Sequence, residues 1–231
     1  MNPKNPNNLN LANSLSDLRH ETSPLITDLD FSNTADNPFD QLTLWLNQAI
    51  KHHYFQPNAL CLSTSDLDTQ QPSSRMVLLK SADPENGLIF YSNYDSRKAQ
   101  ELEKNPKACG LFYWDELERQ IRVEGIIQKT SNTISDQYFQ SRPRESQLGA
   151  SISPQSKIIP NRDFLTQAYE NLNNTLKNQP IPRPDYWGGY QLLPHYFEFW
   201  QGRNSRLHDR IIYKLNNLNN LNNWVKSRLA P

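Results

Sequence analysis

The sequence predicts a mostly β protein with flanking helices, of the α+β class. Short runs rich in β-branched and aromatic residues follow one another through brief turns, which is typical of antiparallel strands. The helical patterns do not alternate regularly with these runs, so nothing indicates βαβ units, and neither GxGxxG nor a Walker A motif occurs. Hydrophobic residues make up 36% of the 231 residues, which is enough for a buried core.

The elements are predicted from local patterns. A helix is expected over 37–53, because Asn37 can cap it, Pro38 suits its first turn, and apolar residues recur on one face. Further helices are expected over 96–106, 135–143 and 161–179. Strands are expected over 59–64, 74–80, 87–93, 108–114, 119–129, 190–201, 209–214 and 224–229. Within 119–129, alternation places polar and apolar residues on opposite faces.

Two segments differ in composition from the rest. Residues 1–35 are rich in Asn, Ser, Asp and Pro and lack periodicity, which predicts a flexible arm before one domain over 36–231. The repeat LNNLNNLNN at 215–223 predicts a long loop. No apolar run approaches the roughly 18 residues of a membrane span, so we expect a soluble, cytoplasmic protein.

The overall charge excludes some classes of function. Lys+Arg and Asp+Glu both number 24, and this balance argues against a general nucleic-acid or membrane-surface binder. Cys61 and Cys109 lie in strand-like runs without CxxC spacing, so we expect buried small hydrophobes instead of metal ligands or a disulfide. No Asp/Glu/His cluster has metal-ligand spacing, so no metal is expected.

Two groups of cations have the spacing of anion ligands. Arg75 and Lys80 bracket an apolar run, and a spacing of five puts them on opposite faces of a regular strand. They serve two different ligands, flank an irregularity, or are ordinary strand-end charges. Ser96, Arg97 and Lys98 open a helix, whose N-terminus favours anions. This second group is a phosphate cradle or a plain cap with surface charges.

Two further groups lie later in the chain. Tyr138, Arg142 and Ser146 recur at spacings of four, although Pro143 makes a shared helix face only approximate; the alternative is a solvated helix end. Within QGRNSRLHDR, alternation places three side chains on one face if the segment is extended, namely Arg206, His208 and Arg210. Their mutual repulsion favours an anionic or electron-rich partner over a solvated hairpin tip. Together the four groups predict a site for two phosphates and a polar planar molecule.

Several motifs resemble the pyridoxine/pyridoxamine 5'-phosphate oxidase family. They are RMVLLK, FYSNYDSRKAQELEKNP, LERQIRVEG, YFQSRPRESQLGA, PDYWGGY, FEFWQGRNSRLHDR and the terminal RLAP. The resemblance implies an FMN-binding split β-barrel, with two FMN sites at a homodimer interface and a C-terminal dimerisation segment. It implies oxidation of pyridoxamine or pyridoxine 5'-phosphate to pyridoxal 5'-phosphate, with O2 reduced to H2O2.

The resemblance also implies roles for individual residues. The FMN-binding residues are Arg75, Met76, Val77, Leu78, Leu79, Lys80, Tyr91, Ser92, Ser96, Arg97, Lys98, Gln120, Gln155, Ser156, Trp200 and Arg210. Among these, the other subunit supplies Gln120, Trp200 and Arg210. The residues that bind the substrate phosphate are Lys80, Tyr138, Arg142 and Ser146. Arg206 and His208 are the catalytic pair and hold the pyridine ring. Arg203 matches no family ligand and is expected to be a surface charge.

Two alternatives and one departure accompany this resemblance. A split-barrel FMN reductase would keep the FMN-phosphate residues but not SRPRESQ together with RLHDR. A non-catalytic FMN- or pyridoxal-phosphate-binding protein would keep the pocket without turnover. In the segment LRHET, Thr22 stands where the family has a tyrosine that can help to cover the substrate. The resemblance therefore does not imply this contact between the N-terminal segment and the substrate.

Overall fold

The computed structural model describes residues 28–177, 179–217 and 223–231. Its strands are β1 (Ala59–Ser65), β2 (Pro72–Leu78), β3 (Ser81–Asp83), β4 (Gly87–Asn93), β5 (Lys107–Trp114), β6 (Arg119–Lys129), β7 (Trp187–Gln201), β8 (Asp209–Leu215) and β9 (Trp224–Arg228). Its helices are η1 (Phe31–Asn33), α2 (Pro38–Lys51), α3 (Arg97–Lys104), α4 (Asn132–Ser141), α5 (Arg144–Ile152), α6 (Arg162–Thr175) and η2 (Asn204–Arg206). The predicted strands and helices are confirmed to within a few residues, whereas η1, β3, α5 and η2 were not predicted.

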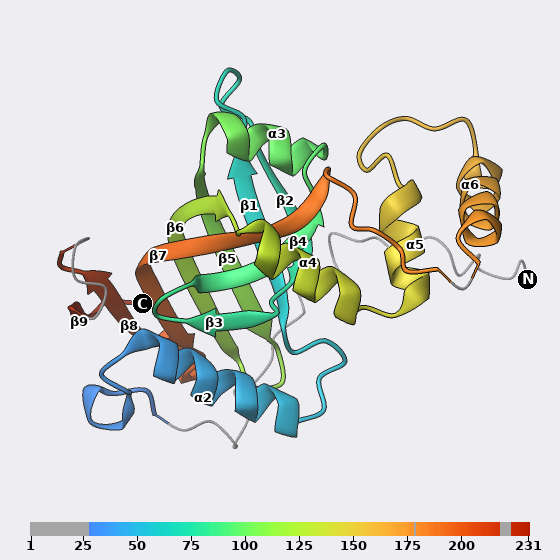
Figure 1. Cartoon of the computed structure of the whole chain (residues 1–231). Helices are drawn as coiled ribbons and strands as arrows, with labels where there is room; N and C mark the ends of the chain where they lie inside the picture. Colours follow the sequence, from blue (N-terminus) through green and yellow to red (C-terminus); the bar gives the residue numbers. More distant parts are fainter. Residues whose placement is uncertain (1–27, 178, 218–222) are drawn as a thin grey trace, which may run out of the picture.

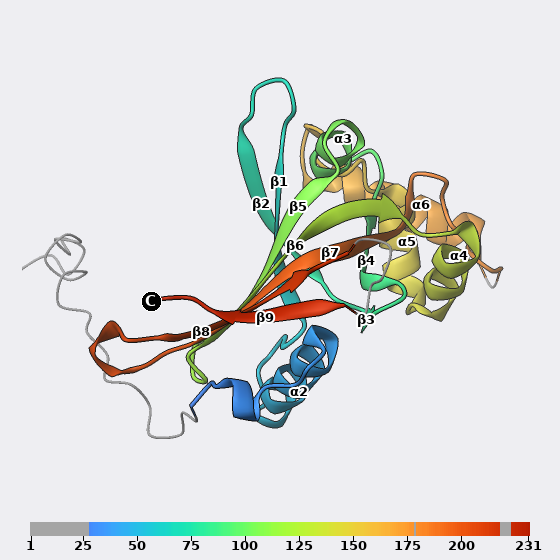
Figure 2. The same cartoon turned by 90° about the vertical axis from the view of Figure 1, so that its left-hand side faces the viewer.

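All strand pairs of the described residues are antiparallel, and they form one curled sheet with the order β2-β1-β5-β6-β7-β4-β3. β8 extends this sheet from β7, and β9 pairs with β8. Figure 1 shows α2 and α3 at opposite ends of the half-barrel and α4, α5 and α6 gathered on one side of it. In Figure 2, the β8–β9 hairpin extends away from these three helices. The predicted α+β class is therefore confirmed.

The long strand β7 organises the sheet. One edge pairs with β6, while its other edge pairs first with β4 and then with β8. The register with β6 shifts at Gly125, which faces Pro194. A Cβ at Gly125 would lie 2.2 Å from the carbonyl oxygen of Leu193, so the close approach requires glycine. Pro194, which has no N–H to donate, is tolerated at such an irregularity.

The core covers one face of the sheet. Ile121 and Val123 of β6 are fully buried there, and α2 brings Trp45 edge-on to Phe199 at 5.3 Å between ring centroids. The alternation predicted for β6 is thus confirmed. Its other face carries Gln120, Arg122 and Glu124, which are half-buried; we call this the open face.

The two cysteines also lie on the open face. Cys109 pairs directly with Glu124, and Cys61 lies opposite Leu111 on the neighbouring strand. Both cysteines are free and half-buried. The expectation that they are buried small hydrophobes is therefore wrong, because the core covers the other face of their strands.

Residues 28–35, the described part of the predicted arm, belong to the domain. Residues 1–27 lie outside the described residues, and with them Thr22. The rest of the predicted arm packs against the domain: Leu29 is only 4% exposed within the core, and the Tyr213 hydroxyl donates to the carbonyl of Ala35 at 2.6 Å. Residues 28–35 therefore belong to the domain, because Leu29 finds a buried apolar site there.

The Asn-rich loop between β8 and β9 is closed at its base. Residues 218–222 lie outside the described residues, but the N–H of Asn216 donates to the carbonyl of Asn223 at 2.9 Å. Leu215, the first residue of the predicted loop, is the last residue of β8 and pairs with Trp224. No helix in the described part of the chain is long and apolar enough to cross a membrane.

Replacing residues 217–222 by a two-residue turn is expected to leave the fold intact. The paired ends of β8 and β9 already define the hairpin, and loop length affects the free energy of unfolding only weakly. Thermal unfolding should show a change in Tm below about 3 °C, which corresponds to less than about 1 kcal/mol. A larger fall, or loss of soluble protein, would show that the loop packs.

Candidate functional site

A pocket of about 670 Å³ opens where β2, β4 and the start of β7 meet α4 and α5. It brings together most of the site residues predicted for one subunit: Met76, Val77, Leu78, Lys80, Tyr91, Ser92, Lys98, Tyr138, Arg142, Ser146 and Gln155. Sequence reasoning missed the other lining residues, which are Asn93, Pro143, Gly149, Ala150, Ser153 and Trp187. The volume is within the usual range for sites that hold small molecules and cofactors.

Lys98 places a buried cation at this pocket. Only 8% of the residue is exposed, and its Nζ donates to Ser92 Oγ at 2.9 Å, Ser96 Oγ at 3.0 Å and Gln155 Oε1 at 2.7 Å. All three acceptors are neutral. Burial, followed by the nearby charge of Arg75, lowers the pKa of Lys98 to about 8. A cation that is buried without a carboxylate contact suits an anionic ligand.

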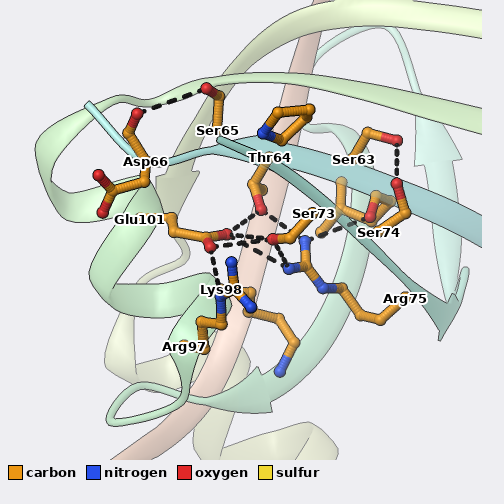
Figure 3. Close-up of polar contacts among 12 residues, drawn as sticks. Ser63, Thr64, Ser65, Asp66, Ser73, Ser74, Arg75, Arg97, Lys98 and Glu101 are labelled. Carbon is orange, nitrogen blue, oxygen red and sulfur yellow. Dashed lines mark hydrogen bonds and ion pairs between the residues drawn. The ribbon is translucent and has the colours of Figure 1, made fainter. Parts of the chain in front are cut away.

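Arg75 and Arg97 meet at a carboxylate that sequence reasoning missed. Figure 3 shows Glu101 of α3 pointing toward β1 and β2. Its Oε1 accepts from Arg97 Nε at 2.8 Å, and its Oε2 lies 3.3 Å from Arg75 Nη2. Thr64 and Ser73 also donate to this carboxylate. A glutamate four residues after an arginine is an ordinary helix pair, so the sequence offered no sign of its burial.

The electrostatics of Glu101 follow from these contacts. Burial alone would raise the pKa of this carboxyl group, but the hydrogen bonds from Thr64, Ser73 and Arg97, together with the charge of Arg75, lower it overall. Glu101 is therefore ionised near neutral pH and is held between the two arginines.

Arg142 provides another cation of the pocket. Its guanidinium carbon lies 4.6 Å from the ring centroid of Trp187, and burial lowers the pKa of Arg142. Its Nη1 is buried and has no hydrogen-bond partner among the described residues. An orphaned guanidinium N–H that lines a pocket points to an anionic ligand, because leaving it unpaired is costly.

The aromatic wall beside Arg142 is flat. Tyr91 and Tyr138 stack with 3.7 Å between ring centroids and 14° between planes, and Trp187 lies nearly parallel beside this pair, 5.6 Å from Tyr91 and 6.3 Å from Tyr138. Lys80 Nζ lies 6.0 Å from the Tyr138 ring centroid. The wall therefore combines aromatic surface with a cation, which suits a planar ligand that carries negative charge.

The helix is interrupted at Pro143, as the sequence predicts, so the face shared by Tyr138, Arg142 and Ser146 is only approximate. α4 ends at Ser141, Arg142 has extended dihedral angles, and Pro143 precedes the first residue of α5. Proline stops one helix here but suits the start of the next. The expected residues on both sides of this break, Tyr138 and Ser146, still line the same pocket.

A second group of predicted residues does not line the pocket. Gln120, Trp200 and Arg210 pair directly across β6, β7 and β8, so their side chains form one row on the open face. The His208 ring lies 4.6 Å from the Trp200 ring. Trp200 and the pocket residue Trp187 are thirteen positions apart on β7, about 40 Å along an extended strand. These residues therefore form a separate group within one chain.

The predicted alternation of Arg206, His208 and Arg210 is wrong. Asn204–Arg206 form a short 3₁₀ turn, in which Ser205 and Arg206 have φ values of 57° and 61°. β8 begins only at Asp209, so the three side chains do not share a strand face. Arg206 is exposed, while His208 is half-buried against Trp200.

Arg203 is also more than a surface charge. Its Nε donates to Asp209 Oδ2 at 2.8 Å, and its guanidinium also pairs with Asp28. Its backbone N–H donates to His208 Nδ1 at 3.0 Å. Arg203 thus fixes the turn, and its N–H occupies the Nδ1 acceptor of the histidine.

The remaining residues predicted for one subunit do not line the pocket: Arg75, Leu79, Ser96, Arg97 and Ser156. Leu79 is buried in the core, and Ser156 is exposed with φ at 70°. Ser96 occupies the N-cap position of α3 without a side-chain capping bond, and its hydroxyl accepts a hydrogen bond from Lys98. Within the described ranges, no group of three or more His, Cys, Asp or Glu side chains has the geometry of a metal site.

The chain is similar to several known proteins. Residues 46–175 match the family model described as pyridoxamine 5'-phosphate oxidase. Residues 187–231 match a model described as the pyridoxine 5'-phosphate oxidase C-terminal dimerisation region. The chain is 50% identical over 195 residues to the pyridoxine/pyridoxamine 5'-phosphate oxidase of Acaryochloris marina, covering 84% of this chain and 86% of that protein. The corresponding protein of Gloeothece citriformis is 45% identical over 218 residues, 94% and 99% of the two chains.

Solved structures are also similar. PhzG from Burkholderia lata 383, in complex with tetrahydrophenazine-1-carboxylic acid, aligns with a TM-score of 0.81 and 29% identity over 89% of this chain and 99% of that one. A pyridoxamine 5'-phosphate oxidase-related, FMN-binding protein from Nostoc punctiforme has a TM-score of 0.65 at 17% identity, over 83% and 96% of the two chains, and supports the split-barrel fold. With two family models spanning most of the sequence, the chain belongs to the pyridoxamine 5'-phosphate oxidase family.

Proposed function

We propose that this protein is an FMN-dependent oxidase that converts pyridoxamine 5'-phosphate and pyridoxine 5'-phosphate to pyridoxal 5'-phosphate. One pocket contains the buried Lys98 ammonium and the buried Nη1 of the half-buried Arg142, and neither side chain contacts a carboxylate among the described residues; this observation carries the proposal. Two such groups match two phosphates, one on the cofactor and one on the substrate. The relatives that carry this oxidase name support the same reaction.

The residues present fit FMN. Its phosphate would meet Lys98, whose neutral acceptors leave its charge available, together with Arg75 and Arg97. The backbone of β2 would border the flavin ring, with Tyr91 and Ser92 on the β4 side of the pocket. When bound, FMN would supply the redox chemistry, a two-electron oxidation at substrate C4' that is balanced by reduction of O2 with two protons to H2O2.

The substrate would bind in the remainder of the pocket. Arg142 offers its unpaired Nη1 to the substrate phosphate, and Lys80, Tyr138 and Ser146 complete this subsite. The stacked Tyr91 and Tyr138 rings would provide an apolar surface beside the substrate ring. These residues therefore bind and orient the substrate, while the electrons travel through the cofactor.

The proposed active enzyme is a homodimer with shared sites. The row of Gln120, Trp200 and Arg210 lies about 40 Å along β7 from Trp187 of the same chain. A second copy, arranged by the two-fold symmetry common among dimers, can bring its row to this pocket. The match of residues 187–231 to a dimerisation region supports this arrangement.

Arg206 and His208 should then act on substrate, and Arg210 on flavin. Arg206→Lys is expected to raise KM or lower kcat with FMN retained, because a lysine cannot cover a planar ring as a guanidinium does. Arg210→Ala should loosen FMN or slow its reduction instead. FMN occupancy and steady-state kinetics of the two variants distinguish these roles. Loss of FMN in Arg206→Lys, with normal kinetics after reconstitution, would refute the division.

The purified protein provides the test of the proposed function. It should be yellow, release FMN on denaturation, and consume O2 with pyridoxamine 5'-phosphate while pyridoxal 5'-phosphate forms. FAD or no flavin would refute the cofactor. Flavin without turnover would indicate a binding protein, and turnover only with a reduced nicotinamide would indicate a reductase. The cytoplasmic location stays a prediction.

A further inference from the structure

We propose that Glu101 is a positioning residue that holds Arg75 and Arg97 in place for the phosphate of FMN. The inference rests on the proposed function, because it takes FMN as the ligand of the pocket that the neighbouring Lys98 lines. It assigns a role to a buried acid in the middle of a cationic site.

The Glu101 carboxylate is enclosed by hydrogen-bond donors. Glu101 is 3% exposed, and groups from three elements reach it: Thr64 of β1, Ser73 and Arg75 of β2, and Arg97 of its own helix (Figure 3). Ser73 Oγ lies 2.9 Å from Oε1 and 2.7 Å from Oε2. A carboxylate with donors on both oxygens is fixed in orientation, so it is a rigid anchor for the arginines.

Glu101 leaves N–H donors free on each of the two arginines. Arg97 uses only Nε toward Glu101, and its two Nη groups have no acceptor among the described residues. Arg75 uses Nη1 and Nη2 toward Leu62, Thr64, Ser73 and Glu101, while its Nε has no acceptor in the same part of the chain. Each guanidinium is therefore held at one edge and keeps donors for a second anion.

The formal charge of this cluster matches that of a phosphate. Arg75, Arg97 and Lys98 carry +3 in total and Glu101 carries −1, so the cluster has a formal charge of +2 (3 − 1). A phosphate monoester carries about −1.5 to −2 at pH 7. Without the carboxylate, three neighbouring cations would repel one another, and the largely exposed Arg97 side chain would move into solvent. Glu101 therefore holds the cations together and matches their sum to a dianion.

The experiment compares FMN with riboflavin, which lacks the phosphate. The full-length protein is stripped of flavin, and dissociation constants for both ligands are measured by flavin fluorescence. In Glu101→Gln, the affinity for FMN should fall about tenfold while the affinity for riboflavin stays unchanged, because a charge-assisted anchor is lost. A fold defect would lower both affinities. Glu103→Gln, which removes a charge from an exposed position on the same helix, is the matched control and should change neither.

A second variant keeps the test decisive if Glu101→Gln does not fold. Ser73→Ala removes the hydroxyl that bridges Glu101 and Arg75 but preserves every charge, and it should lower the FMN-to-riboflavin affinity ratio about threefold. An unchanged ratio in Ser73→Ala, or in a folded Glu101→Gln, overturns the inference, as does tighter FMN binding. If the wild-type protein binds riboflavin as well as FMN, or neither, the proposed function fails instead.

Discussion

Replacing Arg142 by Met is expected to raise KM for pyridoxamine 5'-phosphate about 10- to 150-fold while FMN stays bound. The Arg142 guanidinium lies on Trp187 with a buried, unpaired Nη1, so it is prepared for a phosphate oxygen before substrate arrives. A hydrogen bond to a charged group contributes about 1.5–3 kcal/mol, which corresponds to that range of affinity.

The same substitution should not destabilise the protein. Methionine fills similar space on Trp187, and it removes a buried charge without a carboxylate contact among the described residues, so the free energy of unfolding should stay constant or rise. Steady-state kinetics measure KM, FMN occupancy measures cofactor binding, and thermal unfolding measures stability. Arg162→Met, on the exposed start of α6, is the control and should leave KM unchanged. An unchanged KM in Arg142→Met would remove Arg142 from the substrate site.

Replacing Lys98 by Met should weaken FMN binding about 10- to 150-fold. The ammonium group is buried against three neutral acceptors, so its charge is available to the cofactor phosphate. Flavin retention during gel filtration and titration of the stripped protein both measure the effect. Lys104→Met, which removes an exposed lysine from the same helix, should retain FMN. Full retention by Lys98→Met would place the phosphate elsewhere.

The pH dependence gives Lys98 a separate signature. Burial lowers its pKa to about 8 in the flavin-free protein, so the ammonium loses its proton as the pH rises through 8. The cationic form binds phosphate, and FMN affinity of the wild-type protein should therefore decrease between pH 7 and pH 9. The affinity of Lys98→Met should be flat over that range. A parallel decrease in both proteins would assign the titration to another group.

Local signals predicted much of this molecule. Asn37 and Pro38 mark the start of α2 through their own capping chemistry, and alternation along β6 separates Ile121 from Gln120 without knowledge of any neighbour. The motif around Arg142 also predicted residues that line the pocket, although the helix breaks at Pro143. Such features depend on residues close in the sequence, so they can be recognised there.

Other features depend on the tertiary structure. The positive φ angles of Ser205 and Arg206 turn the chain before β8, and neither residue type is typical of that conformation. Glu101 becomes a buried anchor only because the β1–β2 hairpin covers it with hydroxyl groups. Leu29 packs under β8 far along the chain, so a polar composition around it suggested an arm. These residues had no local signal for their roles.

The central position of β7 has a consequence for protein synthesis. Its partners β4 and β6 leave the ribosome long before it, and at roughly 5–20 residues per second they wait several seconds for the strand that joins them. During that time each presents an unpaired edge, which is a template for aggregation. Slower initiation or chaperone capture of the nascent chain would protect these edges. A premature stop before residue 187 would remove the middle of the sheet as well as the C-terminal segment, and leave a polypeptide with no route to the native state.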